Sequence, residues 1–219
     1  MPEQIIPKSE SSKRVLYPEI EPFKKNIVNT GDGHQIYFEE CGNPAGIPVL
    51  VVHGGPGGGC SPSMRRYFDP DAYYIVLFDQ RGCGRSRPYA SIENNTTWHL
   101  LSDMEMIRKK LNVEKFVLFG GSWGAALSLI YAQKYPEMVS KIILRGVFTM
   151  TREELNWFYQ EGGASKFWPE AWRSFRDMLP PDERKNLIEG YHLRLFGSSP
   201  TEQGRYARAW TAWENALAN

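Results

Sequence analysis

The sequence has few cysteines and almost no net charge, and each of these features excludes a class of protein. Its 219 residues include only three cysteines, without a C-x-x-C pair. This excludes a disulfide framework and a zinc site of that type. The 26 Lys and Arg residues balance 25 Asp and Glu residues, so the protein lacks the positive field that a nucleic acid would need. We expect no metal, no cofactor and no nucleic-acid partner.

The N-terminus lacks the apolar segment of a secretory signal. One uncharged run, residues 116–133, approaches the length of a membrane span, but Gly120, Gly121, Ser122 and Gly124 lie near its start. We interpret this run as a buried strand, a tight turn and a helix. The sequence therefore predicts a soluble, cytoplasmic protein that does not enter a membrane. It does not indicate an oligomeric state.

Short apolar runs alternate with helical patterns along the first two thirds of the sequence. Strands are predicted at 27–30, 35–40, 48–53, 73–79, 116–119 and 141–144, and helices at 96–111 and 125–135. The first two strands flank a Gly-Asp-Gly turn, which is typical of an antiparallel pair. The alternation of strands and helices predicts the α/β class, with a mostly parallel sheet covered on both faces.

The composition changes near residue 149 and predicts three regions. Residues 1–24 are polar and interrupted by prolines, and we interpret them as an N-terminal arm. Residues 25–148 are predicted to form the α/β core. Residues 149–219 carry only helical patterns and five of the seven tryptophans, which predicts a helical cap subdomain inserted after a strand.

A serine between glycines follows one of the predicted strands. The segment Gly120-Gly121-Ser122-Trp123-Gly124 matches G-x-S-x-G and lies between an apolar strand and a helix of small residues. A nucleophile elbow needs this order, because its sharp turn exposes the serine hydroxyl at a helix N-terminus. The alternative is a plain glycine-rich turn without chemistry. We interpret Ser122 as a nucleophile.

A glycine-rich segment, His53-Gly54-Gly55-Pro56-Gly57-Gly58-Gly59, follows the strand at 48–53. In hydrolases with an elbow serine, such a loop supplies one oxyanion-hole N–H, and the residue after the serine supplies the other. We therefore predict that the N–H groups of Gly55 and Trp123 form the oxyanion hole. A phosphate-binding loop is excluded, because neither Gly-Lys-Ser/Thr nor G-x-G-x-x-G occurs here. His53 is interpreted as structural rather than as a general base.

Charged residues also follow the strand at 73–79, in Asp79-Gln80-Arg81-Gly82-Cys83-Gly84-Arg85-Ser86. A metal or phosphate role is conceivable for this segment. We favour a tight turn held by hydrogen bonds between aspartate and arginine. Asp103, on the predicted helix at 96–111, is likewise interpreted as structural.

The three motifs H-G-G-P-G-G-G, D-Q-R-G-C-G-R-S and G-G-S-W-G, in this order, closely resemble the proline iminopeptidase (prolyl aminopeptidase) family of α/β-hydrolases. The resemblance covers about residues 15–219 and extends to Ala209-Trp210-Thr211-Ala212-Trp213-Glu214. It implies an α/β-hydrolase core with a helical cap. It also implies a serine aminopeptidase that releases N-terminal proline from peptides through an acyl-enzyme.

The resemblance also implies roles for single residues. Ser122 matches the nucleophile, and Gly55 and Trp123 match the oxyanion hole. Glu214 matches a cap carboxylate that receives the free imino group of the substrate. Phe148 and Tyr159 match the aromatic surroundings of the proline ring. From the residues alone, an alternative is that Glu214 lies on a solvent-exposed flank of its helix without a functional role. Its own helix offers it no cationic partner.

A general base is missing from the pattern. In this fold the acid and the histidine follow the serine along the chain, and only His192 does so, within a helical segment. We therefore expect a sequence truncated within or just after the cap, without the triad Asp and His, weakly active or inactive alone, and with a sheet incomplete at its C-terminal edge. The alternatives are another α/β-hydrolase, such as an esterase or a carbon–carbon-bond hydrolase, and a non-catalytic fragment.

Overall fold

The computed structural model describes residues 16–197 and 199–218. The chain divides between Phe148 and Thr149 into two compact units, and each is described here on its own. Of the predicted N-terminal arm, residues 1–15 lie outside the described part. The residues that follow run along the first unit, where the backbone N–H of Tyr17 donates to the carbonyl of Arg66.

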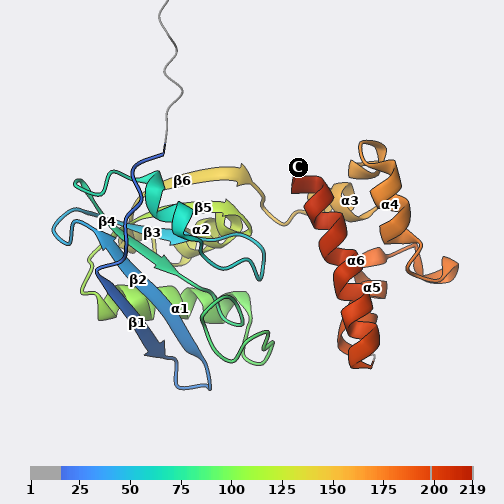
Figure 1. Cartoon of the computed structure of the whole chain (residues 1–219), viewed down its shortest axis with the longest axis horizontal. Helices are drawn as coiled ribbons and strands as arrows, with labels where there is room; N and C mark the ends of the chain where they lie inside the picture. Colours follow the sequence, from blue (N-terminus) through green and yellow to red (C-terminus); the bar gives the residue numbers. More distant parts are fainter. Residues whose placement is uncertain (1–15, 198, 219) are drawn as a thin grey trace, which may run out of the picture. The chain divides into compact units, whose positions relative to one another are not determined.

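The first unit is built on a six-stranded sheet (Figure 1). Its strands are β1 (Lys24–Asn29), β2 (Gln35–Gly42), β3 (Ile47–Val52), β4 (Tyr73–Phe78), β5 (Phe116–Ser122) and β6 (Val139–Val147). They lie in the order β1-β2-β4-β3-β5-β6. The β1–β2 and β2–β4 pairs are antiparallel, and the β4–β3, β3–β5 and β5–β6 pairs are parallel. The expected α/β class and the antiparallel pair at its start are confirmed.

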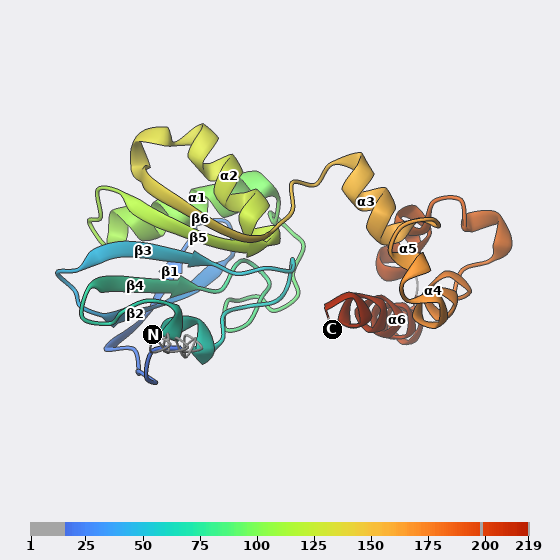
Figure 2. The ribbon, with the colours of Figure 1, turned by 90° about the horizontal axis from the view of Figure 1, so that it is seen from above.

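Both faces of the sheet are covered over its central strands β3 and β4, and alternate residues of each strand point to opposite faces. Leu50 and Val52 of β3 pack with helices α1 (Thr97–Lys110) and α2 (Trp123–Lys134). These two helices lie together on one face (Figure 2). Val49 and Val51 pack on the other face with Phe68, at the end of the short helix η1 (Pro62–Tyr67). This explains why the central strands read as continuous apolar runs.

Among the described residues, β6 pairs with β5 alone and forms one edge of the sheet. It is longer than the strand predicted at 141–144 and follows the short helix η2 (Pro136–Met138). Ile142, Ile143 and Val147 of β6 are exposed, at 38%, 43% and 59%. The sequence predicts a sheet that is incomplete at its C-terminal edge, and this stays a prediction. No helix in the described ranges is long and apolar enough to span a membrane.

The second unit contains only helices within its described residues. They are α3 (Arg152–Tyr159), η3 (Ala164–Lys166), α4 (Pro169–Arg176), η4 (Pro181–Glu183), α5 (Leu187–Gly197) and α6 (Pro200–Ala218) (Figure 1). Its core is aromatic, because Phe175 stacks on both Tyr191 and Trp213. Four of the five tryptophans that set this region apart in the sequence pack in or against this core, whereas Trp157 is exposed.

Candidate active site

The motifs singled out from the sequence in the first unit meet at the carboxyl ends of the parallel strands. Val52, at the end of β3, pairs with Gly120 near the end of β5. β4 lies on the other side of β3 and runs in the same direction. The segments that follow β4, β3 and β5 therefore leave the sheet at the same end, the carboxyl ends of these strands. Open α/β sheets bind their ligands at this end of the strands.

Ser122 has the backbone geometry of an elbow. It is the last residue of β5 and the N-cap of α2, with φ 55° and ψ −124°. A positive φ in a residue other than glycine costs about 1–3 kcal/mol and persists only where the surrounding structure enforces it. Ser122 is exposed, and the first N–H groups of α2, beginning with that of Trp123, have no partner within the helix. The turn thus presents a hydroxyl at the positive end of a helix.

Two glycines let the neighbouring segments pass against this turn. A Cβ on Gly54 would lie 3.3 Å from the Cβ of Ser122 and 3.0 Å from the carbonyl oxygen of Gly121. A Cβ on Gly124 would lie 2.1 Å from the carbonyl oxygen of Val52. The glycine loop therefore lies directly against the serine, and α2 begins against the end of β3.

We expect Gly124→Ala to lower the free energy of unfolding by about 1–3 kcal/mol or more, because the new methyl group meets backbone that cannot move aside. Urea titration measures the loss. The control is Gly121→Ala in the same turn, where the nearest atom to the new Cβ is Nε of the exposed Arg145 side chain, at 3.1 Å. Equal losses in the two variants would show that the close approach of α2 and β3 does not matter.

The loop after β3 uses backbone conformations that favour glycine, with φ of 119° at Gly55 and 101° at Gly57. His53, at its root, is 2% exposed. Its ring nitrogens lie 2.8 Å from the carbonyl oxygen of Gly54 and 3.0 Å from the backbone nitrogen of Gln80. Burial lowers the pKa of His53, so the ring is held neutral and engaged. These contacts agree with a structural role for His53.

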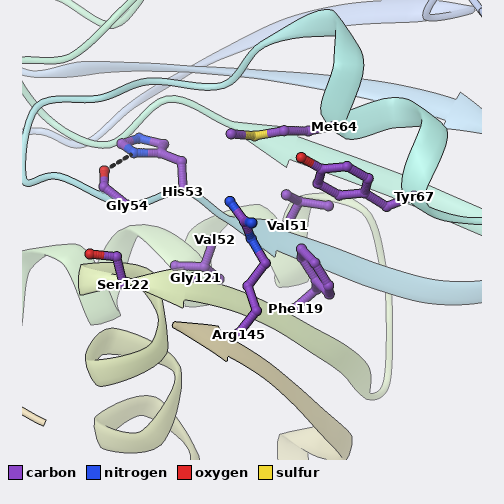
Figure 3. A pocket seen from close by; sticks show the side chains of 10 residues that line it. All are labelled: Val51, Val52, His53, Gly54, Met64, Tyr67, Phe119, Gly121, Ser122 and Arg145. Carbon is purple, nitrogen blue, oxygen red and sulfur yellow. Dashed lines mark hydrogen bonds between the residues drawn. The ribbon is translucent and has the colours of Figure 1, made fainter. Parts of the chain in front are cut away.

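A hollow of about 90 Å³ opens beside Ser122 (Figure 3). Most of its lining comes from the ends of β3 and β5 and from η1. The lining residues are Val51, Val52, His53, Gly54, Met64, Tyr67, Phe119, Gly121, Ser122 and Arg145. The hollow is therefore lined by apolar side chains together with His53, Ser122 and Arg145.

Arg145 is the charged residue of this hollow, and the sequence did not single it out. It lies on β6, opposite Gly121 in the register with β5. Its side chain has no acidic partner among the described residues, so its charge is available to a ligand. The signal in the sequence was a lone cation near the end of the strand that follows the elbow helix, and it becomes visible only once β6 is paired with β5.

The second unit contains the other predicted site residues. The hydroxyl of Tyr159 donates to Oε1 of Glu214 at 2.7 Å, and Nε1 of Trp210 donates to the same oxygen at 2.8 Å. The rings of Tyr159 and Trp210 stack with centroids 4.8 Å apart. Burial, followed by the charge of Glu214, raises the pKa of Tyr159, so the phenol remains a donor. Within the described chain, Oε2 of Glu214 receives no hydrogen bond.

Phe148, the remaining predicted residue, is half-buried at the end of the first unit. It is not among the residues that line the hollow beside Ser122. Its predicted place in the surroundings of a proline ring stays a prediction.

No histidine within residues 16–197 forms a hydrogen bond with Ser122. Nε2 of His34 lies 2.7 Å from the carbonyl oxygen of Glu93. His99 belongs to the capping box of α1, and His192 packs its ring against Phe196. Among the described residues, therefore, no histidine is placed to act as a base at the Ser122 hydroxyl.

The charged segment after β4 forms the expected turn. Asp79 accepts hydrogen bonds from the backbone nitrogens of Cys60 and Arg85 and from the Arg85 side chain. Burial opposes ionisation of Asp79, but these donors outweigh it and hold the pKa below its usual value. The carboxylate thereby ties the end of the glycine loop to the turn, and its role is structural.

Comparison with known proteins agrees with this arrangement. The alpha/beta hydrolase fold family matches residues 47–212. A proline iminopeptidase of Xylella fastidiosa is 50% identical over 94% of this chain, which covers 65% of that protein. One of Arabidopsis thaliana is 48% identical over 94% of this chain, which covers 54% of it. The chain thus spans between about half and two thirds of the length of these relatives.

Solved structures show the same fold. A proline iminopeptidase-related protein of Thermus thermophilus has a TM-score of 0.54 and 27% identity, covering 88% of this chain and 66% of that one. An epoxide hydrolase of Vigna radiata, with a TM-score of 0.50 and 21% identity, covers 80% of this chain and 55% of that one. The chain belongs to the α/β-hydrolase fold family and is similar to proline iminopeptidases.

Proposed function

We propose that this chain carries the nucleophile, the oxyanion hole and part of the substrate-binding site of a serine aminopeptidase that releases N-terminal proline from peptides. The observation that carries the proposal is the exposed Ser122, held at positive φ against the glycine loop. The substrate class comes from the relatives, which are 50% and 48% identical and are named proline iminopeptidases. The cytoplasmic location stays a prediction.

In this proposal Oγ of Ser122 attacks the carbonyl carbon of the N-terminal proline. The tetrahedral intermediate places its oxyanion between the N–H groups of Gly55 and Trp123. The N-terminus of α2 adds a favourable potential for this negative charge. Expulsion of the peptide amine leaves a prolyl ester on Ser122, which water hydrolyses.

Glu214 receives the secondary ammonium group of the N-terminal proline. One oxygen of the carboxylate is held by Tyr159 and Trp210, and the other is left for a ligand. The stacked rings beside it offer an apolar surface to a pyrrolidine ring and a favourable face to a cation. Phe148 is proposed as a further aromatic neighbour of the ring.

The proposal assigns no described residue as the general base. Turnover by this chain is therefore expected to be slow, since a serine site without its base retains only the contributions of the oxyanion hole and of binding. Covalent labelling of Ser122 by a fluorophosphonate should therefore be measured in addition to turnover.

Glu214→Gln tests the substrate class. We expect the rate with proline p-nitroanilide to fall about 10–100-fold, because a hydrogen bond between charged groups contributes about 1.5–3 kcal/mol. Acylation by p-nitrophenyl acetate, which has no ammonium group, is expected to be unchanged. Both rates are followed by release of the coloured product.

The matched control is Glu202→Gln, which makes the same change at an exposed position of the same helix. It should alter neither rate. Equal effects of Glu214→Gln on the two substrates would favour a general esterase. Failure of the chain to form any adduct at Ser122 would favour a non-catalytic fragment.

A further inference from the structure

Gln80 is a buried polar residue that the proposed reaction leaves without a role. It follows β4, is 1% exposed, and forms three hydrogen bonds to two other segments. Its side-chain oxygen accepts from Nε1 of Trp123 at 2.9 Å. Its side-chain nitrogen donates to the carbonyl of His53 at 2.8 Å, and its backbone N–H donates to Nε2 of His53 at 3.0 Å. Gln80 thus connects His53, at the start of the glycine loop, to Trp123, the first residue of α2.

These contacts fix the proton on the His53 ring. A backbone N–H can only donate, so Nε2 of His53 must be the unprotonated acceptor for Gln80. The proton then lies on Nδ1, which donates to the carbonyl of Gly54 at 2.8 Å. The backbone nitrogen of Gly59 also lies 3.2 Å from Nδ1. The side-chain nitrogen of Gln80 lies 3.4 Å from the same atom. These two longer contacts are not hydrogen bonds in the tautomer that satisfies the two shorter ones.

The bond to Gly54 orients the next peptide. The Gly54–Gly55 bond is not among the cis peptides, and in a planar trans peptide the C=O and N–H point in opposite directions. A carbonyl directed at His53 therefore turns the Gly55 N–H away from His53. In Figure 3 the Gly54 oxygen faces His53, and Ser122 lies on the other side of Gly54. The hydrogen bond thus favours the direction that an oxyanion donor needs.

We infer that Gln80 is a positioning residue: it fixes the positions of the two N–H donors of the oxyanion hole relative to each other. Through Trp123 it fixes the start of α2, and through His53 it fixes the Gly54–Gly55 peptide. The two donors belong to different segments of the chain, so a direct tie between those segments sets their separation. The inference rests on the proposed function, since it takes Gly55 and Trp123 as the donors.

The test compares Gln80→Met with the unsubstituted chain. Methionine keeps the length of the side chain and loses both side-chain hydrogen bonds, to Trp123 and to the carbonyl of His53. The backbone N–H of residue 80 can still donate to Nε2 of His53. We expect acylation of Ser122 by p-nitrophenyl acetate to slow about 10–100-fold, less than the loss of about 10²–10³-fold for a removed oxyanion donor, because the donors are displaced and not lost. The saturation constant for the ester should change little, because the ester in its ground state does not need the aligned donors.

Tyr131→Phe is the matched control. It removes another buried hydrogen bond of the first unit, from the Tyr131 hydroxyl to Glu105. We expect it to reduce stability, as Gln80→Met does, while the acylation rate is retained. Equal slowing in both variants would mean that Gln80 acts only through general stability, and would overturn the inference.

A pair of substitutions at His53 separates its two hydrogen bonds. The Asn side-chain nitrogen lies as many bonds from Cβ as Nδ1 of histidine, so His53→Asn can still donate to Gly54. The terminal atoms of Gln correspond in the same way to Nε2, so His53→Gln can still accept from Gln80 but loses the bond to Gly54. We expect both variants to slow acylation, because each breaks one link between Gln80 and the Gly54–Gly55 peptide. His53→Gln, which loses the direct bond to that peptide, should slow it more, by about tenfold or more. The reverse order would overturn the inference.

A readout without turnover separates this inference from the proposed function. In the amide NMR spectrum, Gln80→Met should shift the signals of both Gly55 and Trp123, whereas Tyr131→Phe should leave both in place. If the unsubstituted chain forms no adduct at Ser122, the proposed function fails, and the amide shifts still decide on the positioning of the two donors. Unchanged Gly55 and Trp123 signals in Gln80→Met would refute it.

Discussion

Ser122→Ala is expected to abolish covalent capture of the chain by a fluorophosphonate and to remove its hydrolysis of proline p-nitroanilide. The reason is that the exposed hydroxyl of Ser122, at the N-terminus of α2, lies against the glycine loop and is the proposed nucleophile. Where a serine site holds its full catalytic set, removal of the nucleophile lowers kcat by about 10⁶-fold, which is the upper limit of the effect here. Mass spectrometry of the intact chain, followed by peptide mapping, measures the adduct.

Two further variants make this result specific. Ser140→Ala removes an exposed serine of β6 and should leave the adduct unchanged. Ser122→Gly should lose the adduct and be at least as stable as the unsubstituted chain, because glycine adopts a positive φ without the steric cost that serine carries. A modified peptide that excludes residue 122, or an adduct that survives in Ser122→Ala, would rule out Ser122 as the nucleophile.

The elbow and the glycine loop could be predicted from the sequence because their signals are local. A strand, a sharp turn and a helix follow one another directly around Ser122, and the glycines stand where backbones approach closely. The α/β class could also be predicted, since buried parallel strands read as continuous apolar runs. The side-chain partners of these segments depend on which strands are neighbours, and that order does not follow the chain.

Gln80 and Arg145 illustrate the difference. From the sequence, Gln80 was interpreted as part of a turn held by aspartate and arginine. Its hydrogen-bond partners, His53 and Trp123, are 27 and 43 residues away along the chain. Arg145 reaches the hollow only because β6 pairs with β5 next to the elbow. Neither contact leaves a periodic or compositional signal. Both become predictable only after the order β4-β3-β5-β6 is known.

Glu214 lies between these cases. Its own helix offered no cationic partner, which the sequence revealed, and the nearby Trp210 was visible one turn away. The third member of the cluster, Tyr159, is 55 residues distant. The resemblance to a family, rather than any pattern in the helix, selected it.

Arg81 and Asp103 form a buried ion pair. Nε and one terminal nitrogen of Arg81 donate to the two oxygens of Asp103 at 2.7 and 2.8 Å. Asp103 is completely buried and has no other donor among the described residues. The same guanidinium donates to Asp32 and to the carbonyl of Asn94, each at 2.6 Å. Arg81 therefore joins the β1–β2 turn, the segment after β4 and helix α1.

Arg81→Met is expected to lower the free energy of unfolding by about 3–5 kcal/mol, because it leaves the Asp103 charge buried without a partner. Urea titration near neutral pH measures the loss. Arg66→Met is the control, since Arg66 pairs with the exposed Glu19, and surface pairs contribute about 0–1 kcal/mol. A loss in Arg81→Met no larger than in this control would contradict the prediction.

The dependence of this loss on pH identifies its cause. Burial raises the pKa of Asp103, and Arg81 opposes that rise. Without Arg81 the folded-state pKa should rise further above the value of about 3.9 in the unfolded chain. Protonation of Asp103 then favours the folded variant. The deficit should be smallest below about pH 4 and should grow as the pH increases through the raised pKa.

Removal of both charges should restore most of the lost stability. Arg81→Met combined with Asp103→Leu leaves no buried carboxylate, and apolar residues of similar volume often replace a buried ion pair without loss of stability. We therefore expect the double variant to regain most of the stability that Arg81→Met loses and to show no comparable change with pH. If it were as unstable as the single variant at every pH, the loss would come from the links of Arg81 to Asp32 and Asn94 rather than from a stranded charge.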